Sequence, residues 1–136
     1  MTAGALKNAS TRVKKRVLVA DDDSGILETI RAALVGRGYD VVTAHDGAEA
    51  LMCAERDAPD LIVLDMVMPR RSGLSVIDRL HSNKARKATP IIVVSGQNDE
   101  RQLEYMNERG VVEYLHKPFD IDQLLKRIDA ILPALD

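Results

Sequence analysis

Short apolar runs recur along the chain and alternate with longer stretches in which apolar residues stand three or four positions apart. Three of the runs are continuously apolar and rich in Val and Ile, and two are weaker. Runs of this length and composition are typical of strands that are buried on both faces of a parallel sheet. The predicted strands are 17–20, 41–44, 61–64, 91–94 and 111–115.

The stretches between these runs have the apolar spacing of amphipathic helices, and their ends are recognisable. Gly36 and Gly38 would end the first helix, because glycine readily adopts the left-handed conformation found at helix C-termini. Asp46 and Glu49 have the spacing of a capping box at the start of the second helix. Ser72 is a candidate N-cap for the third, since its hydroxyl can accept a hydrogen bond from the first turn.

The last two predicted helices differ in character. The fourth, roughly 99–109, is polar for a helix that packs against a core, and Gly110 would end it. The fifth would begin near Asp120 and Gln123 and end at Pro133. Five strands alternating with five helices predict an α/β fold, with a doubly wound parallel sheet and helices on both of its faces.

Composition and charge fit one globular domain and exclude several classes of protein. The chain has 136 residues, of which 46% are hydrophobic, and its net charge of −2 gives no overall attraction to nucleic acid or anionic membranes. No apolar run reaches the roughly 20 residues of a membrane-spanning helix. Cys53, the single cysteine, is interpreted as a packing residue. We therefore expect a cytoplasmic protein without direct contact to membrane or nucleic acid.

Residues 1–14 are predicted to form a flexible tail ahead of a single domain that covers residues 15–136. A short basic cluster lies where the tail meets the first strand. It is interpreted as part of a solvated arm, because so few charges are a weak signal for nucleic-acid binding. The cluster consists of Arg12, Lys14, Lys15 and Arg16.

Chemically active side chains follow the predicted strands at their carboxyl ends, where ligands collect in doubly wound sheets. Acids follow the first and third strands, a hydroxyl ends the fourth, and a lysine follows the fifth. Each of these alone is also typical of a helix cap or a turn, but together they indicate a shared site. The residues are Asp21, Asp22, Asp23, Asp65, Ser95 and Lys117.

The types of these side chains indicate a particular chemistry. Clustered carboxylates repel one another and need a cation, and hard oxygen ligands without thiol or imidazole groups suit Mg²⁺. A lysine and a hydroxyl provide what the oxygens of an arriving phosphoryl group need. A carboxylate can act as the nucleophile that accepts such a group. The combination therefore predicts phosphoryl transfer to a carboxylate, with Mg²⁺ as the cofactor.

Over about residues 15–132 the sequence resembles the response-regulator receiver family of two-component signalling. The resemblance implies a flavodoxin-like sheet with strand order 2-1-3-4-5. It also implies a phosphoacceptor signalling protein, which is not an enzyme acting on a separate substrate. The matching segments are 17–23 (VLVADDD), 46–51 (DGAEAL), 64–69 (LDMVMP), 73–74 (GL), 93–96 (VVSG) and 114–119 (YLHKPF).

The roles of the family's site residues carry over to the matching positions. Asp65 would accept a phosphoryl group from a histidine kinase or a histidine phosphotransferase. The carboxylates of Asp21, Asp22 and Asp65 would hold Mg²⁺. The backbone carbonyl of Val67 would complete the protein ligands, and Asp23, one position past the acidic pair, is interpreted as a helix cap.

The resemblance also assigns residues to the switch that follows phosphorylation. Ser95 and Lys117 would contact the phosphoryl group, and Tyr114 would be the switch aromatic that moves inward with Ser95. The peptide bond between Lys117 and Pro118 would be cis. A downstream partner would bind the face formed by the fourth helix, the fifth strand and the fifth helix. The domain would be a monomer or a phosphorylation-dependent dimer.

Two residues would tune the lifetime of the phosphorylated state. By the family's geometry, Val67 and Gln97 flank the path along which water attacks an aspartyl phosphate. Val67 is apolar, so it can exclude water but cannot orient it, whereas the amide of Gln97 can bond a phosphoryl oxygen or a water. Slow self-dephosphorylation is therefore expected.

The residues leave two other functions open. One is a pseudo-receiver that binds partners without phosphorylation, although the intact set of site residues argues against it. The other is a haloacid-dehalogenase-like phosphohydrolase, which needs an acid two residues after the nucleophile; here Val67 occupies that position and cannot transfer a proton. Arg70 and Arg71 beside the site are interpreted as part of a solvated loop, with a role in partner docking as the alternative.

Overall fold

The computed structural model describes residues 14–96 and 100–132. Most of the predicted tail, together with Gln97 and Pro133, lies outside these residues. The described strands form one parallel sheet in the order β2-β1-β3-β4-β5, which confirms the strand order implied by the family resemblance. The strands are β1 (Arg16–Ala20), β2 (Asp40–Ala44), β3 (Leu61–Asp65), β4 (Ile91–Ser95) and β5 (Val111–His116).

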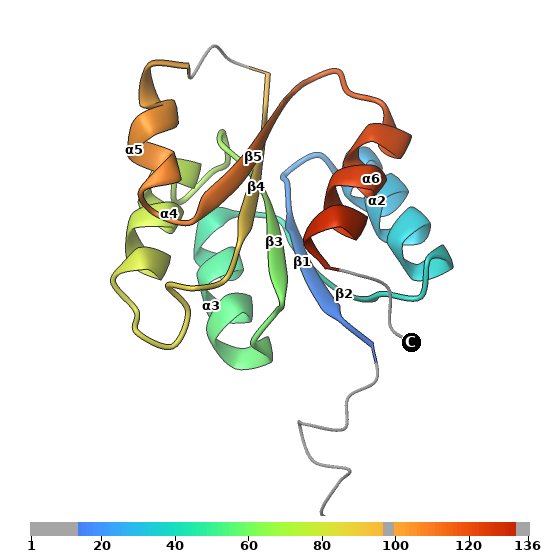
Figure 1. The fold of residues 1–136 in the computed structure, drawn as a ribbon, viewed down its shortest axis with the longest axis horizontal. Helices are drawn as coiled ribbons and strands as arrows, with labels where there is room; N and C mark the ends of the chain where they lie inside the picture. The colour runs from blue at the N-terminus through green and yellow to red at the C-terminus, as the bar shows by residue number, and fades with distance from the viewer. Residues whose placement is uncertain (1–13, 97–99, 133–136) are drawn as a thin grey trace, which may run out of the picture.

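Helices cover both faces of this sheet, as predicted (Figure 1). α3, α4 and α5 lie on one face, and α2 and α6 lie on the other. None of the helices in the described part of the chain is long and apolar enough to cross a bilayer. The helices are α2 (Ser24–Gly36), α3 (Gly47–Asp57), α4 (Gly73–His81), α5 (Leu103–Asn107), which the 3₁₀ turn η2 (Glu100–Gln102) precedes, and α6 (Ile121–Ile131).

The central strands β1, β3 and β4 are apolar except at one end residue each, Arg16, Asp65 and Ser95, because both of their faces are buried. In β1, Val17 and Val19 pack on the side of α2 and α6, whereas Leu18 and Ala20 pack on the side of α3 and α4. Successive side chains of a strand point to opposite faces, so a strand between two helical layers needs apolar residues throughout. Burying each Val or Leu contributes about 1.5–3 kcal/mol. The central strands are therefore held firmly, and they fix the positions of the residues that follow them.

Side-chain caps hold the helix starts next to the carboxyl edge of the sheet. Asp23 caps α2 by accepting hydrogen bonds from two backbone N–H groups, and Ser72 caps α4. The carboxylate of Asp46 accepts from the Glu49 N–H at 2.8 Å. In a regular capping box the Glu49 carboxylate would accept a hydrogen bond from the N–H of the N-cap residue, Asp46. Here it accepts instead from the N–H of the preceding residue, His45, at 2.6 Å. This contact fixes the turn before α3 as well as its first residue.

The fourth predicted helix is shorter than expected. Its α-helical part is only Leu103–Asn107, and Met106 is its one buried residue. A helix with a single buried side chain gains little from packing, so the segment does not extend over the whole predicted range. Asp120 occupies the N-cap position of α6, as expected, but its side chain makes no capping hydrogen bond.

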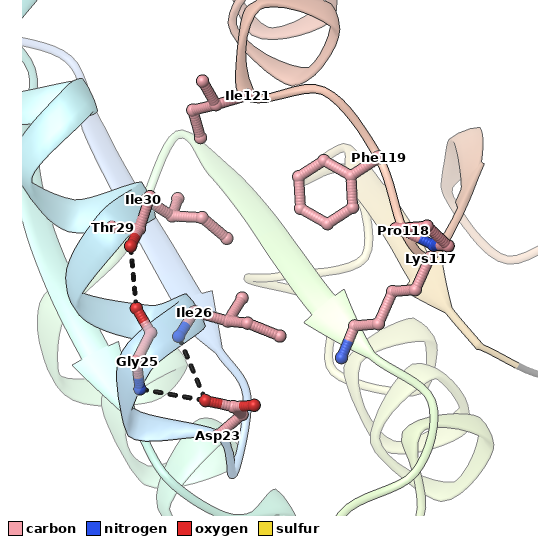
Figure 2. Close-up of a pocket in the computed structure, with 9 residues that line it drawn as sticks. All are labelled: Asp23, Gly25, Ile26, Thr29, Ile30, Lys117, Pro118, Phe119 and Ile121. Carbon is pink, nitrogen blue, oxygen red and sulfur yellow. Dashed lines mark hydrogen bonds between the residues drawn. The ribbon is translucent and has the colours of Figure 1, made fainter.

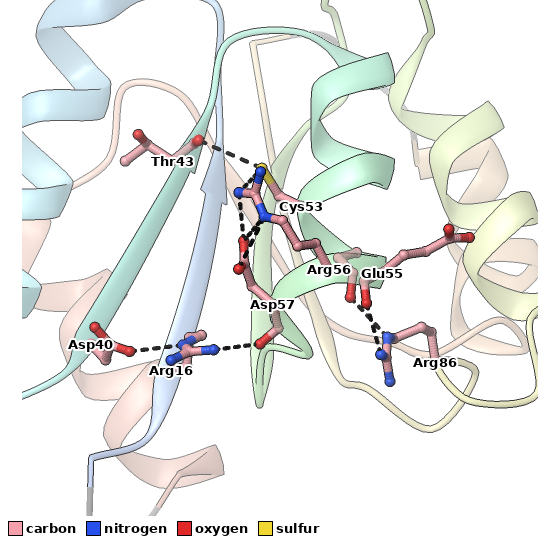
Figure 3. A network of polar contacts seen from close by, with 9 residues as sticks. Arg16, Asp40, Thr43, Cys53, Glu55, Arg56, Asp57 and Arg86 are labelled. Carbon is pink, nitrogen blue, oxygen red and sulfur yellow. Dashed lines mark hydrogen bonds and ion pairs between the residues drawn. The ribbon is translucent and has the colours of Figure 1, made fainter. Parts of the chain in front are cut away.

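Arginines tie the amino edge of the sheet to the C-terminal end of α3 (Figure 3). Arg16 donates to the backbone carbonyl of Asp57 at 2.7 Å and pairs with Asp40 at 2.7 Å. Arg86 donates to the backbone carbonyl of Ala54 at 2.8 Å. Such contacts satisfy carbonyls that have no partner within the helix. The interpretation of Arg16 as part of a solvated arm was therefore wrong, because this residue belongs to β1.

Gly73, the first residue of α4, lies directly against the chain that follows β3. Its N–H donates to the carbonyl of Met66 at 3.0 Å. A Cβ atom at this position would lie 2.6 Å from Cα of Met66 and 2.9 Å from the carbonyl oxygen of Asp65. Only glycine allows this close approach of two backbones.

We predict that Gly73→Ala destabilises the domain by about 1–3 kcal/mol, because the backbone after Asp65 must move to make room. Gly36→Ala is the matched control, since nothing lies within 4 Å of its Cβ position at the end of α2. That change should stabilise the domain by about 0.4–1 kcal/mol. Urea unfolding measures both, and equal midpoints for the two variants would contradict the close-packing argument.

Candidate functional site at the carboxyl edge of the sheet

The polar residues predicted at the strand ends meet at one edge of the sheet. Asp21 follows β1, Asp65 ends β3 and Ser95 ends β4, and these three are the buried polar or charged residues of the described chain. Asp22 is exposed beside them. Carboxylate oxygens of Asp21, Asp22 and Asp65 lie within 4.8 Å of one another. The structure thus brings the predicted acidic cluster together.

Lys117 reaches this cluster from the loop after β5. Its Nζ lies 2.9 Å from Oδ2 of Asp21 and 3.2 Å from Oδ2 of Asp65. The other oxygen of each carboxylate accepts a hydrogen bond from a backbone N–H. Oδ1 of Asp21 accepts from the N–H of Asp23 at 2.9 Å, and Oδ1 of Asp65 accepts from the N–H of Val67 at 3.2 Å. Both buried carboxylates are therefore held in fixed orientations on both of their oxygens. The ion pair between Lys117 and Asp21 was not predicted, because nothing local in the sequence marks it.

Burial and charge shift the pKa values of the site. Burial raises the pKa of Asp65 and the charge of Asp21 adds to this, while the N–H of Val67 and the ammonium of Lys117 act in the opposite direction. Burial alone would lower the pKa of Lys117, but its contacts with Asp21 and Asp65 outweigh burial, and the net pKa is raised. The lysine is consequently a fixed positive charge at neutral pH.

The donor set fits a divalent cation. Three carboxylates and one ammonium leave two negative charges when the carboxylates are ionised, and the ligand atoms are hard oxygens. Mg²⁺ prefers such oxygens and keeps part of its water shell, so it needs only a few protein ligands at an open edge. The exposed position of Asp22 leaves the cluster accessible from solvent.

The residues predicted to form the switch, Ser95, Tyr114 and Lys117, lie on β4, on β5 and directly after β5. The backbone N–H of Lys117 donates to the carbonyl of Ser95 at 2.8 Å, which joins the ends of the two strands. Tyr114 lies beside Val93 in the sheet, and its ring meets that of His116 edge-on, with centroids 5.0 Å apart. Alternation along β4 and β5 places the side chains of Ser95, Tyr114 and His116 on one face.

Two predicted features of the site concern the backbone and its neighbours. The peptide bond between Lys117 and Pro118 is cis. The side chain of Val67 is 50% exposed beside Asp65. The other residue expected to tune dephosphorylation, Gln97, is not among the described residues.

A tight turn that the sequence did not indicate lies between β3 and α4. Arg70 has a φ of +72°, and the N–H of Arg71 donates to the carbonyl of Pro69 at 2.8 Å. A bond between residues two apart around a positive φ defines a γ-turn, a strained conformation. The Arg70 guanidinium lies 3.5 Å from Asp46, and the Gly47 N–H donates to Pro69. The turn before α3 therefore supports the loop that follows Asp65.

An apolar groove of about 680 Å³ opens next to Lys117, between α2 and the segment that leads into α6 (Figure 2). Its charged side chains, Asp23 and Lys117, lie at the end nearest the acidic cluster, and Thr29 lies farther along α2 beside Ile30. No motif predicted this groove, because its walls come from distant segments of the chain. The apolar side chains in its lining are Ile26, Ile30, Phe119 and Ile121.

Comparison with known proteins agrees with this arrangement. A sequence model of the response regulator receiver domain matches residues 17–129. Proteins named response regulator MprA from Mycobacterium avium and Mycobacterium leprae are 40% identical over 117 residues, which cover 86% of this chain and 50% of theirs. The chain thus spans about half the length of these relatives.

Solved structures with similar folds belong to the same group. The receiver domain of the Francisella response regulator 1452 has a TM-score of 0.79 at 34% identity, covering 87% of this chain and 96% of that one. The chemotaxis response regulator CheY4 of Vibrio cholerae has a TM-score of 0.80 at 30% identity, covering 88% and 99%. Fold, acidic cluster and sequence relatives agree, and the chain belongs to the response regulator receiver domain family.

Proposed function

We propose that this domain accepts a phosphoryl group on Asp65 from a histidine kinase or a histidine phosphotransferase, in a reaction that depends on Mg²⁺. The observation that carries this proposal is the environment of Asp65, a buried carboxylate with a lysine 3.2 Å away and two further carboxylates beside it. The signal then leaves through the face formed by α5, β5 and α6. The downstream protein binds there.

The chemistry follows from the contacts of the carboxylate. An oxygen of Asp65 attacks phosphorus, the bond from phosphorus to the donor nitrogen breaks, and the product is an aspartyl phosphate. Lys117 moves its hydrogen bonds from the carboxylate to the phosphoryl oxygens, and the hydroxyl of Ser95 provides a further donor. Asp21, Asp22, Asp65 and the Val67 carbonyl would hold Mg²⁺, which would supply positive charge to offset the charge on the transferring group.

The groove beside Lys117 supports a protein as the phosphoryl donor. It is lined mostly by apolar side chains and opens next to the acidic cluster. A helix that carries a phosphohistidine can bury apolar residues in this groove while its imidazole reaches Asp65. Val67 lies where a haloacid-dehalogenase-like phosphohydrolase would need its acid, so nothing in the described site favours that second function.

We predict that acetyl phosphate with Mg²⁺ adds one phosphoryl group to the protein and none to Asp65→Asn. The amide of asparagine is not a nucleophile of this kind, so the variant should lose the product completely. Phosphate-affinity electrophoresis separates the two forms. A phosphorylated band of equal intensity in both proteins would place the modification on another residue, and no band in either would favour a pseudo-receiver.

The metal assignment predicts different effects for two adjacent acids. Asp22→Asn should weaken Mg²⁺ binding about tenfold, because it removes one charge from the acidic cluster. Asp23→Asn is the matched control: it makes the same chemical change one position away, and asparagine still caps α2. Calorimetric titration with Mg²⁺ measures both, and a similar loss in the two variants would show a general charge effect without a specific ligand.

Removing that charge should also change how the protein responds to heat. Without Mg²⁺, Asp22→Asn should melt at or above the temperature of the unmodified protein, because repulsion within the acidic cluster is reduced. With saturating Mg²⁺ it should gain less stability than the unmodified protein. A lower melting temperature without metal would contradict the repulsion argument.

Val67 should slow the loss of the phosphoryl group by excluding water from the attack path. We predict that Val67→Asn speeds Mg²⁺-dependent decay of the purified phosphoprotein several-fold, about 1 kcal/mol of barrier. Val112→Asn is the matched control, because Val112 is similarly exposed, 48% against 50%, and lies at the opposite end of the sheet in β5. An unchanged or slower decay in Val67→Asn would refute the shielding role.

A further inference from the structure

A polar cluster joins α4 to α5, one of the three elements of the proposed signalling face. The hydroxyl of Tyr105 donates to Oδ1 of Asp78 at 2.6 Å, and Nε of Arg109 lies 3.3 Å from the same oxygen. The Arg109 guanidinium stacks on the Tyr105 ring, with Cζ 3.6 Å from the centroid. We call these three residues, Asp78, Tyr105 and Arg109, the α4–α5 clamp.

The clamp consists of contacts between polar side chains at the surface, separate from the apolar core. Nη1 of Arg109 also donates to the backbone carbonyl of Tyr105 at 3.1 Å, which closes the cluster on itself. The hydrogen bond to Asp78 raises the pKa of Tyr105, so the phenol stays protonated as a donor. Tyr105 remains 37% exposed. Contacts at such a surface are individually weak, and a change elsewhere in the domain can break them.

The two helices that the clamp joins are held very differently. α4 buries Val76, Ile77 and Leu80 against the sheet, whereas α5 buries Met106 and packs the partly buried Leu103 against the same core. Because its apolar attachment is smaller than that of α4, the position of α5 relative to α4 rests more on the clamp. Loss of the clamp would let α5 shift more easily than α4.

The clamp joins α4, which is anchored to the chain after Asp65, to α5. α4 begins at Gly73, whose N–H bonds to Met66 immediately after Asp65. In the sequence α5 lies between Ser95 and Lys117, the two residues proposed to contact the phosphoryl group. A movement of either residue toward a phosphoryl group therefore acts on the segment that contains α5, while α4 stays anchored.

We propose that the α4–α5 clamp holds α5 in the position of the unphosphorylated domain and opens when Asp65 is phosphorylated. This inference rests on the proposed phosphoacceptor function. A phosphoryl-like group at Asp65 that favours the state with the clamp broken must use part of its binding free energy to break the clamp. The clamp consequently weakens the binding of any phosphoryl-like group at Asp65 and keeps the unstimulated domain inactive.

Tyr105→Phe tests this with little disturbance, because it removes one hydroxyl and keeps the ring under Arg109. Glu108→Gln is the matched control. Oε2 of Glu108 lies 3.8 Å from Nη1 of Arg109, but Glu108 is the C-cap residue of α5, so this ion pair does not reach α4. Asp78→Asn is a second variant that weakens the acceptor from the α4 side. Urea unfolding of each variant establishes that the fold is kept.

The experiment titrates beryllofluoride, a stand-in for the phosphoryl group on Asp65, in the presence of Mg²⁺ and follows backbone amide signals by NMR. Tyr105→Phe and Asp78→Asn should bind about three- to tenfold more tightly than the unmodified domain, and Glu108→Gln should stay within about twofold. Without ligand, amide signals of α5 in Tyr105→Phe should already lie part of the way toward their bound positions.

The possible results separate this inference from the proposed function. Equal affinities for the unmodified domain and Tyr105→Phe would show that the clamp is the same in both states, which overturns the inference and leaves the phosphoacceptor role intact. Weaker binding by Tyr105→Phe would assign the clamp to the phosphorylated state and also overturn it. If Asp65→Asn binds beryllofluoride as the unmodified domain does, the proposed function itself fails, and the inference fails with it.

Discussion

The ammonium group of Lys117 lies between the buried carboxylates of Asp21 and Asp65, and this shared ion pair constrains much of the fold around it. Breaking it would leave an uncompensated charge in a buried position, which is strongly destabilising. The lysine follows β5, whereas its partners follow β1 and end β3, so its side chain must pass over the end of β4. The residue at that end is Ser95, which is fully buried.

The two helical layers on either side of this edge are held in different ways. α2 and α6 pack around a continuous apolar cluster, and α2 and the segment that leads into α6 form the walls of the groove beside Lys117. On the opposite face, α3 and α4 are anchored by apolar packing and by caps, and α5 is held by Met106, by Leu103 and by the polar contacts of the clamp. Under the proposed function, a donor would be recognised on the layer that lines the groove, and movement would occur in the layer that contains α5, the helix with the smaller apolar attachment.

The parts of the structure that could be predicted depend on local patterns. Continuous apolar runs identified the strands, and cap residues such as Asp46 and Ser72 identified helix starts, because both signals lie within a few residues. The acidic cluster was also predictable, since the carboxyl ends of parallel strands meet at one edge. The contact of Arg16 with α3, the γ-turn at Arg70 and the clamp on Tyr105 were not predictable. They join segments far apart in the chain or depend on a backbone angle for which these residue types give no signal.

The chain enters and leaves the described fold at the edge of the sheet opposite the acidic cluster (Figure 1). β1 starts there, and α6 ends there, where the hydroxyl of Tyr39 donates to the carbonyl of Leu132 at 3.3 Å. A tether at either end, whether to a sensor surface, a fluorescent protein or a neighbouring domain, therefore points away from the groove and the carboxylates. The domain can be immobilised, or joined to another protein through either end, and the edge that the proposed donor would approach stays open.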